Sequence, residues 1–215
     1  MRYKITSLMA ALALLSVLSA QAATSPTITI TYLPYTISTA GTYVLKSNLQ
    51  YPGSGPSRTP AITIAGPFTG PVVLDLKGFT ISGPGSYIGY AYGIGVSGNN
   101  PGVTIQNGIL TGFDTAVNAG STSNLTVKNV TFRGDWVSVF FQYVDSSFVK
   151  NCDFYGPAGD TTSGIIDRYS SKNNYYSGIT FTKIDFPFSA TNAENGNPMV
   201  FDLQPAPVKA LATNP

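Results

Sequence analysis

The chain has 215 residues, of which 10% are charged, and its formal net charge is +2. So little positive charge gives it no electrostatic means of holding a nucleic-acid backbone, so we expect no nucleic-acid partner. The sequence contains no histidine and a single cysteine, Cys152. This composition excludes Ser-His-Asp and Cys-His catalysis, histidine-based metal sites, structural zinc and an internal disulfide.

The first 22 residues have the features of a secretory signal peptide. Arg2 and Lys4 form a positive start, Leu8–Leu18 is an apolar run, and Ala20 and Ala22 supply the small residues of a cleavage site. The alternative is a transmembrane anchor, but the run is well short of the roughly 20 residues that cross a bilayer. We predict cleavage after Ala22 and a secreted or periplasmic protein that is not integrated into a membrane. Loss of Arg2 and Lys4 would leave it electrically neutral.

After a predicted N-terminal cap with the first strands (residues 23–60), the sequence repeats. Five ten-residue segments align without gaps, and they begin at Leu74, Val103, Leu125, Ser147 and Ile179. Their fifth residues are separated by 29, 22, 22 and 32 positions, and these residues are Gly78, Asn107, Asn129, Asn151 and Lys183. Two spacings of 22 indicate one structural repeat, and the longer ones indicate the same repeat with a loop insertion.

The third and eighth residues of every segment are apolar, which predicts two short strands whose side chains point into a core. The third residues are Leu76, Ile105, Val127, Val149 and Phe181, and the eighth are Ile81, Leu110, Phe132, Phe154 and Phe186. A second apolar run precedes each segment, as in Val137–Phe141. The prediction is an all-β fold, a single-stranded right-handed parallel β-helix of about five to seven coils over residues 61–188. Residues 189–215 are predicted to be a C-terminal extension, partly disordered.

Asparagine at the fifth position adds a specific expectation. Asn tolerates the left-handed backbone region, and its amide can bond to the same amide one strand away. We therefore expect Asn107, Asn129 and Asn151 to form a ladder inside the coil. Cys152 follows in an inward column shared with Phe79, Val130 and Ile184, so we expect a buried thiol.

Several of these runs, such as Ile37–Leu45, Val73–Gly83 and Val103–Gly108, resemble right-handed parallel β-helix proteins of the pectin-lyase-like superfamily. The resemblance covers roughly residues 36 to 188 and implies the fold. It does not imply one activity, because the superfamily includes lyases, hydrolases, epimerases, adhesins and non-catalytic members. The Asn-Thr-Asp, Asp-Asp and Gly-His-Gly motifs of its polygalacturonase-like members are absent from this chain.

Asp167 and Arg168 are the one place where an acid lies beside an arginine, as a lyase site would require. They are weak catalytic candidates, and the alternative is a surface ion pair or solvated turn. No multi-carboxylate loop typical of Ca²⁺ sites occurs, so we expect no metal and no cofactor, Ca²⁺ being conceivable but unsupported by a motif.

Tyrosines gather in the two insertions and predict a ligand-binding surface, because a Tyr ring stacks on sugars while its hydroxyl forms hydrogen bonds. They are Tyr87, Tyr90, Tyr92, Tyr169, Tyr175 and Tyr176. The alternative is that these rings cover exposed edges of the fold. Three functions follow as hypotheses: a non-catalytic module that binds polysaccharide or a cell-surface partner, a small polysaccharide lyase or epimerase acting on acidic glycans, and a structural cell-envelope protein. The oligomeric state stays open.

Overall fold

A computed structural model describes residues 26–53, 58–85, 90–98, 100–157, 162–190 and 200–203. All the regular structure in these residues is β-strand. No helix in this part of the chain is long and apolar enough to cross a membrane. The predicted signal peptide (1–22), Tyr87 and most of the predicted extension 189–215 lie outside the described residues.

The strands form two sheets, and within the described residues neighbouring strands pair in parallel. The ten-stranded sheet contains β1 (Thr27–Ile30), β3 (Gly41–Leu45), β4 (Leu49–Gln50), β6 (Val72–Asp75), β7 (Thr80–Ser82), β9 (Val103–Thr111), β11 (Leu125–Arg133), β13 (Phe148–Tyr155), β15 (Tyr175–Thr182) and β17 (Val200–Leu203). The seven-stranded sheet contains β2 (Tyr35–Ile37), β5 (Ile62–Ala65), β8 (Tyr92–Ser97), β10 (Thr115–Ser123), β12 (Val137–Asp145), β14 (Ser163–Arg168) and β16 (Phe186–Ala190).

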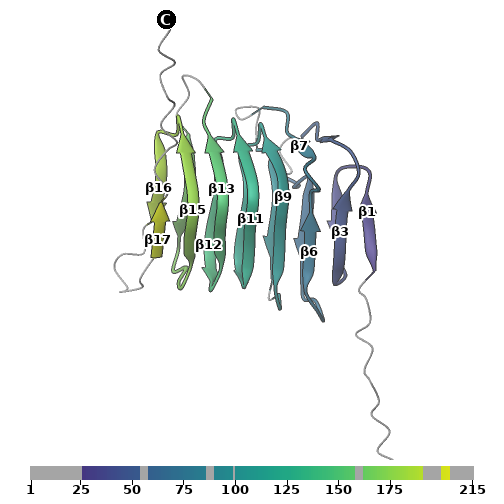
Figure 1. Cartoon of the computed structure of the whole chain (residues 1–215). Coiled ribbons are helices and arrows are strands. Elements are labelled where there is room, and N and C mark those ends of the chain that lie inside the picture. Colours follow the sequence, from purple (N-terminus) through teal and green to yellow (C-terminus); the bar gives the residue numbers. More distant parts are fainter. Residues whose placement is uncertain are drawn as a thin grey trace, which may run out of the picture.

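From β8 onward the chain alternates between the two sheets, so each strand pairs with the strand two further along. Figure 1 shows the strands side by side in chain order, from β1 at one end to β17 at the other. β17 falls inside the predicted extension and pairs with β15, so the sheet continues beyond residue 188. The fold is therefore all-β, with parallel strands in two stacked sheets, compatible with a β-helix-like arrangement.

The predicted 22-residue repeat is confirmed in the centre of the molecule. Leu125 pairs with Val103, and Phe148 pairs with Thr126, each 22 residues away. In the other sheet Thr115 pairs with Val137 at the same offset. One period therefore describes both sheets.

At the two ends the predicted alignment is wrong. Cys152 pairs with Ile179 rather than Ile184, so the last repeat is 27 residues long and not 32. Phe186 consequently leaves the inward column and is exposed. The error arose because the run Ile179–Phe188 alternates apolar and polar residues, so a shift along it leaves a plausible inward pattern.

The first repeat also contains a gap that the alignment lacked. Leu74 pairs with Ile105, whereas Ile81 pairs with Leu110 as predicted. The two additional residues are taken up in the turn between β6 and β7, where Lys77 and Gly78 both have positive φ.

Inward side chains of both sheets form one apolar core. The rings of Phe132 and Phe154 stack in it with centroids 4.8 Å apart, and Phe181 continues the stack at 5.0 Å. Cys152 is fully buried as predicted, and burial raises the pKa of its thiol to about 12.

The asparagine column adopts the expected backbone but not the expected location. Asn107, Asn129 and Asn151 all have φ between 53° and 59°. The Asn129 Nδ2 donates to Asn107 Oδ1 at 3.1 Å, and the Asn107 Nδ2 donates to Asp75 Oδ1 at 3.2 Å. However, Asn129 and Asn151 are exposed, so these amides lie on the outside of the fold and not inside it. The left-handed residue bends the strand, and the inward positions go to apolar neighbours such as Val130.

Candidate functional site

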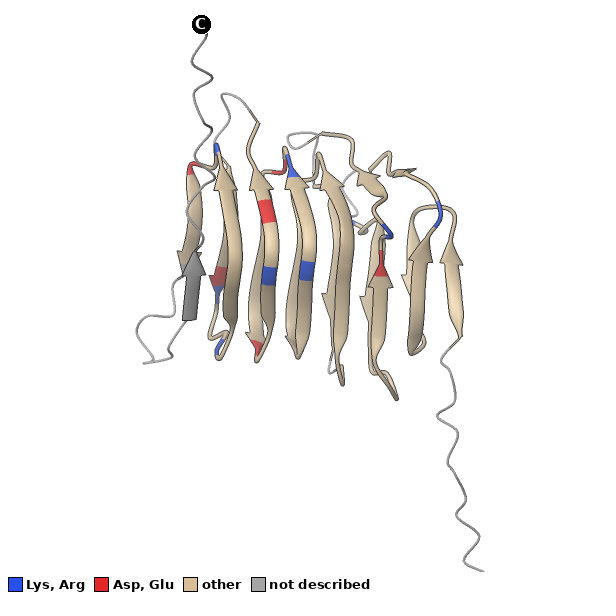
Figure 2. Ribbon diagram, viewed as in Figure 1, with Lys and Arg blue, Asp and Glu red and all other residues tan. Residues whose placement is uncertain are grey.

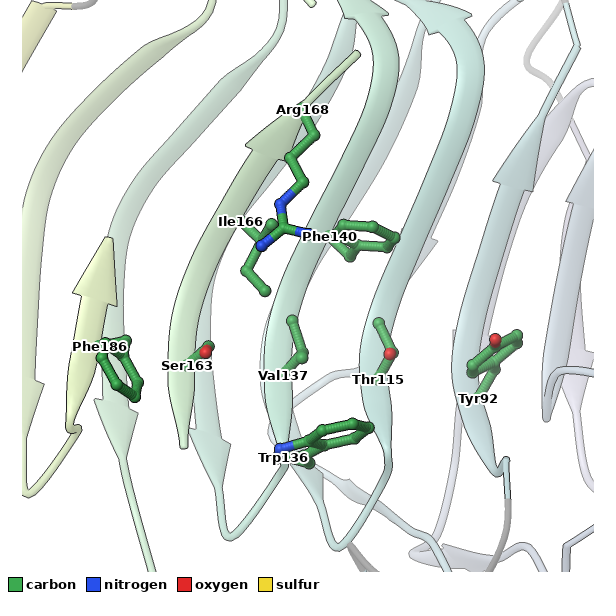
Figure 3. Close-up of a pocket in the computed structure, with 9 residues that line it drawn as sticks. All are labelled: Tyr92, Thr115, Trp136, Val137, Phe140, Ser163, Ile166, Arg168 and Phe186. Atoms are coloured by element: carbon green, nitrogen blue, oxygen red, sulfur yellow. The ribbon is translucent and has the colours of Figure 1, made fainter. Parts of the chain in front are cut away.

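The outer face of the seven-stranded sheet carries a row of side chains in register. Thr115 pairs with Tyr92 on one side and Val137 on the other, and the row continues through Ser163 to Phe186. These residues stand at the start of five neighbouring strands, β8, β10, β12, β14 and β16 (Figure 3). The residues that follow in β10 and β12, Ala116 and Ser138, are buried beneath the row.

A groove lies over this row, with a cavity volume of about 440 Å³. Phe140 and Ile166, cross-strand partners on β12 and β14, form a second row of its lining. Trp136 stands at the edge, in the turn before β12 (Figure 3). Trp136 is 50% exposed and Phe186 is 55% exposed, so two large rings present apolar faces to solvent. We call this surface the aromatic groove.

Backbone and carboxylate contacts hold the turn that carries Trp136. The Trp136 N–H donates to the Phe113 carbonyl at 3.0 Å, and the Phe113 N–H donates to Asp135 Oδ1 at 2.9 Å. Asp135 is fully buried, which raises the pKa of its carboxyl well above the usual value. These bonds tie Trp136 to the preceding repeat, so its ring is presented from a rigid base.

Asp114 makes the equivalent contact one repeat earlier. Its Oδ2 accepts a hydrogen bond from the Ala91 N–H at 3.1 Å, just before Tyr92. Burial raises the pKa of this carboxyl, although the backbone bonds and Arg58 act in the opposite direction. Both carboxylates therefore support the backbone beneath the groove and do not line it.

Arg168 is the one charged residue among those that line the groove. Its side chain extends back across the sheet beside Ile166 and Phe140 (Figure 3). The Arg168 Nε is buried and has no hydrogen-bond partner among the described residues. A ligand with an acceptor group at this position would satisfy that donor.

Asp167 lies on the opposite side of the strand from the groove. It is 1% exposed, and its Oδ2 accepts hydrogen bonds from the Tyr176 hydroxyl at 2.7 Å and Asn174 Nδ2 at 3.1 Å. Burial, together with the charge of Asp167, raises the pKa of Tyr176 well above its usual value. The structure therefore separates Asp167 from Arg168, and they form neither a surface ion pair nor a joint acid and base. Adjacent strand residues point to opposite faces.

Of the five predicted tyrosines that the structure describes, only Tyr92 lines the aromatic groove. Tyr176 is buried and forms part of the core. Tyr90 is exposed, and the Arg58 guanidinium lies 3.7 Å from the centroid of its ring.

The other two described tyrosines form stacked pairs elsewhere. Tyr169 stacks on Tyr143 with centroids 5.8 Å apart, and Tyr175 stacks on Phe148 at 5.2 Å. Each pair joins neighbouring repeats, in line with the alternative that tyrosines cover exposed edges. The predicted tyrosine surface is thus dispersed, and no group of three Asp, Glu, His or Cys side chains in the described part of the chain is placed to hold a metal ion.

The sequence-based prediction missed Trp136, Phe140, Ile166 and Phe186. The sequence contained one signal of an apolar outer surface. Val137, Phe140 and Ile166 are apolar, and not all apolar residues of a strand have to point inward. The only tryptophan immediately before a predicted strand was a second signal. Phe186 was missed because the shifted alignment placed it in the core.

Comparison with known proteins identifies no relative. No known protein family matches the chain, and neither a characterised protein nor a solved structure is similar enough to count as a match.

Proposed function

We propose that this chain is an exported right-handed parallel β-helix that binds a polysaccharide on the outer face of its seven-stranded sheet and does not react with it. The alternation of successive strands between two parallel sheets supports the β-helix, since each pair of strands then corresponds to one coil. The predicted signal peptide supports export.

The aromatic groove is the observation that carries the binding function. Exposed aromatic rings stack on the apolar faces of sugar rings, and the hydroxyls of Thr115, Ser163 and Tyr92 offer hydrogen bonds along the same row. The groove crosses five strands, so it extends about 19 Å at the usual strand spacing. That length suits several consecutive units of a chain molecule better than one small ligand.

The position of Asp167 argues against the lyase or epimerase alternative. A base and an acid that share a substrate must both reach it. Arg168 lines the groove, whereas the Asp167 carboxylate is bonded to Tyr176 and Asn174 on the core side. Binding therefore accounts for the exposed residues with fewer assumptions than catalysis.

A glycan array with the purified mature protein tests this function, followed by titration of the glycans that bind. Trp136→Ala should weaken binding about 30-fold, the effect of removing an aromatic hot-spot residue that stacks on the ligand. Tyr175→Ala is the matched control, because Tyr175 is an exposed aromatic residue too but lies in the other sheet. The glycan affinity of this variant should equal that of the wild type.

Two outcomes would overturn the proposal. One is the absence of glycan binding, or equal loss in Trp136→Ala and Tyr175→Ala. The other is release of unsaturated product from pectate or alginate that disappears in Arg168→Ala, which would establish the lyase instead.

A further inference from the structure

A second hollow adjoins the aromatic groove on the same sheet face, with a cavity volume of about 380 Å³. Tyr92 lines both hollows. Two cross-strand pairs also connect them: Asn118 of the second hollow pairs with Phe140 of the groove, and Gln142 pairs with Arg168. The two hollows are therefore neighbouring parts of one continuous surface.

The second hollow owes its depth to glycine. Gly95 and Gly120 occupy outward positions on β8 and β10, where other strands carry side chains. A Cβ at Gly95 would lie 2.6 Å from Pro60 Cγ, so the proline ring requires glycine there. A Cβ at Gly120 would meet only the Gln142 carbonyl oxygen, at 4.0 Å. The space above Gly120 is thus open.

The polar chemistry of this hollow differs from that of the groove. Its amide side chains, Asn118 and Gln142, each carry both a donor and an acceptor, as sugar hydroxyls do. Arg58 contributes a cation at its edge, held against the Tyr90 ring. Amides farther along β10 and β12, next to the aromatic rings of the groove, fit a ligand that presents hydroxyl groups along its whole length and flat ring faces over the groove.

We infer that the second hollow, centred on Gly120, Asn118 and Gln142, is an additional glycan subsite, and that the ligand is a linear polysaccharide that spans both hollows. This inference rests on the proposed function. From β5 to β16 the combined surface crosses five strand spacings, about 24 Å. A pyranose unit is of similar length to one spacing, so the surface accommodates about five consecutive units.

The test is a chain-length series measured by calorimetry with wild type and variants. The probes are β-1,4-linked glucose, β-1,4-linked N-acetylglucosamine and α-1,4-linked galacturonate oligosaccharides of two to eight units. For the wild type, affinity should rise with length up to about five units and then level off. Gly120→Leu should fill the second hollow, weakening hexamer binding about tenfold while leaving trimer binding unchanged.

Two further variants make the result interpretable. Asn118→Ala with Gln142→Ala removes the amides without filling space and should reduce hexamer affinity about fivefold, the loss expected for one or two hydrogen bonds. Thr126→Leu adds an apolar side chain to the outer face of the other sheet and should change neither probe. Thermal unfolding of each variant verifies that it is folded.

The two failures are distinguishable. If Gly120→Leu weakens trimer and hexamer equally, or affects neither, the second subsite is refuted while the groove stands. If no probe binds the wild type, or Trp136→Ala has no effect, the proposed function fails, and the inference with it.

Discussion

The two outer faces of the molecule differ in chemistry although the strands behind them share one core. The face of the ten-stranded sheet carries a row of Thr104, Thr126, Phe148 and Tyr175, of which the last two stack on each other. The next row includes Lys128 and Lys150. Lys128 lies in β11, and Lys150 and Asp153 lie in β13; Figure 2 shows blue and red bands within this sheet. The face of the seven-stranded sheet carries the rings of the aromatic groove instead.

This difference distinguishes the strand positions whose residues the fold constrains from the positions that it does not constrain. Inward positions must be apolar in both sheets, because they fill a shared core. Outward positions stay in contact with water and contribute little to stability. Polar residues such as threonine and lysine are therefore tolerated there. Exposed rings that line a hollow, as in the aromatic groove, indicate a binding surface, whereas Phe148 and Tyr175 on the other sheet stack on each other.

The largest effect should come from breaking the shared core. Phe132→Ala removes a buried ring from the stack with Phe154 and should lower the free energy of unfolding by about 3–5 kcal/mol, measured by urea denaturation. Phe148→Ala is the control, since Phe148 belongs to the neighbouring strand but is exposed. Its effect should stay below about 1 kcal/mol; equal losses would contradict the division between inward and outward positions.

The stability that buried Asp135 gives to the turn beneath the groove should depend on pH. The pKa of Asp135 is raised from 3.8 by burial, so the protonated carboxyl favours the folded state. Its contribution is fully present below the unfolded pKa and is lost as pH rises through the folded pKa. The free energy of unfolding of the wild type should therefore decline above about pH 4, and Asp135→Asn should remove this decline. At pH 7 the variant should be more stable than the wild type by about 1–3 kcal/mol.

Chemical denaturation at pH 4 and pH 7 measures this difference. Asp153→Asn, on the outer face of the ten-stranded sheet, is the control and should leave the wild-type pH dependence intact. Parallel curves for wild type and Asp135→Asn would contradict the prediction.

The positive charge of Arg168 in the groove should contribute to glycan affinity, whereas the charges on the outer face of the ten-stranded sheet should not. Arg168→Gln should weaken galacturonate oligomers about tenfold, because a charge-assisted hydrogen bond is lost, and neutral glucose oligomers about threefold or less. Lys150→Gln, on the other sheet, should change neither affinity. Calorimetric titration with the same oligosaccharides measures both variants. An equal loss of affinity in Lys150→Gln and Arg168→Gln would show that the charge is not recognised in the groove.

The smallest expected effect concerns the asparagine column on the outer face of the ten-stranded sheet. Asn129→Ala loses the bond to Asn107 and places alanine at positive φ, which should cost about 1 kcal/mol in urea denaturation. Asn129→Gly keeps the backbone conformation accessible and should cost less. An alanine variant as stable as the wild type would mean that neither the bond nor the left-handed residue matters.

Much of the fold was predictable from the residues alone. The all-β class, the 22-residue repeat at Asn107, Asn129 and Asn151, and the burial of Cys152 all follow from local patterns. Each depends on side-chain polarity and on the backbone preferences of single residues, which a sequence displays directly. The candidate site was hardly predictable, since among the predicted site residues that the structure describes only Tyr92 and Arg168 line the groove.

The tertiary structure decided the rest, for a physical reason. An apolar residue in a strand satisfies the same local pattern whether it packs in the core or lies in a groove, so Phe140 and Phe186 could not be assigned from polarity. The pairing of Cys152 with Ile179 depends on how two strands fit together, and a shift along an alternating run changes little in the sequence. The opposite orientations of Asp167 and Arg168 depend in turn on which face of β14 covers the core. By itself the sequence determined the all-β class and the central 22-residue period; the pairing of the strands determined which apolar residues fill the core and which are left outside to form a surface.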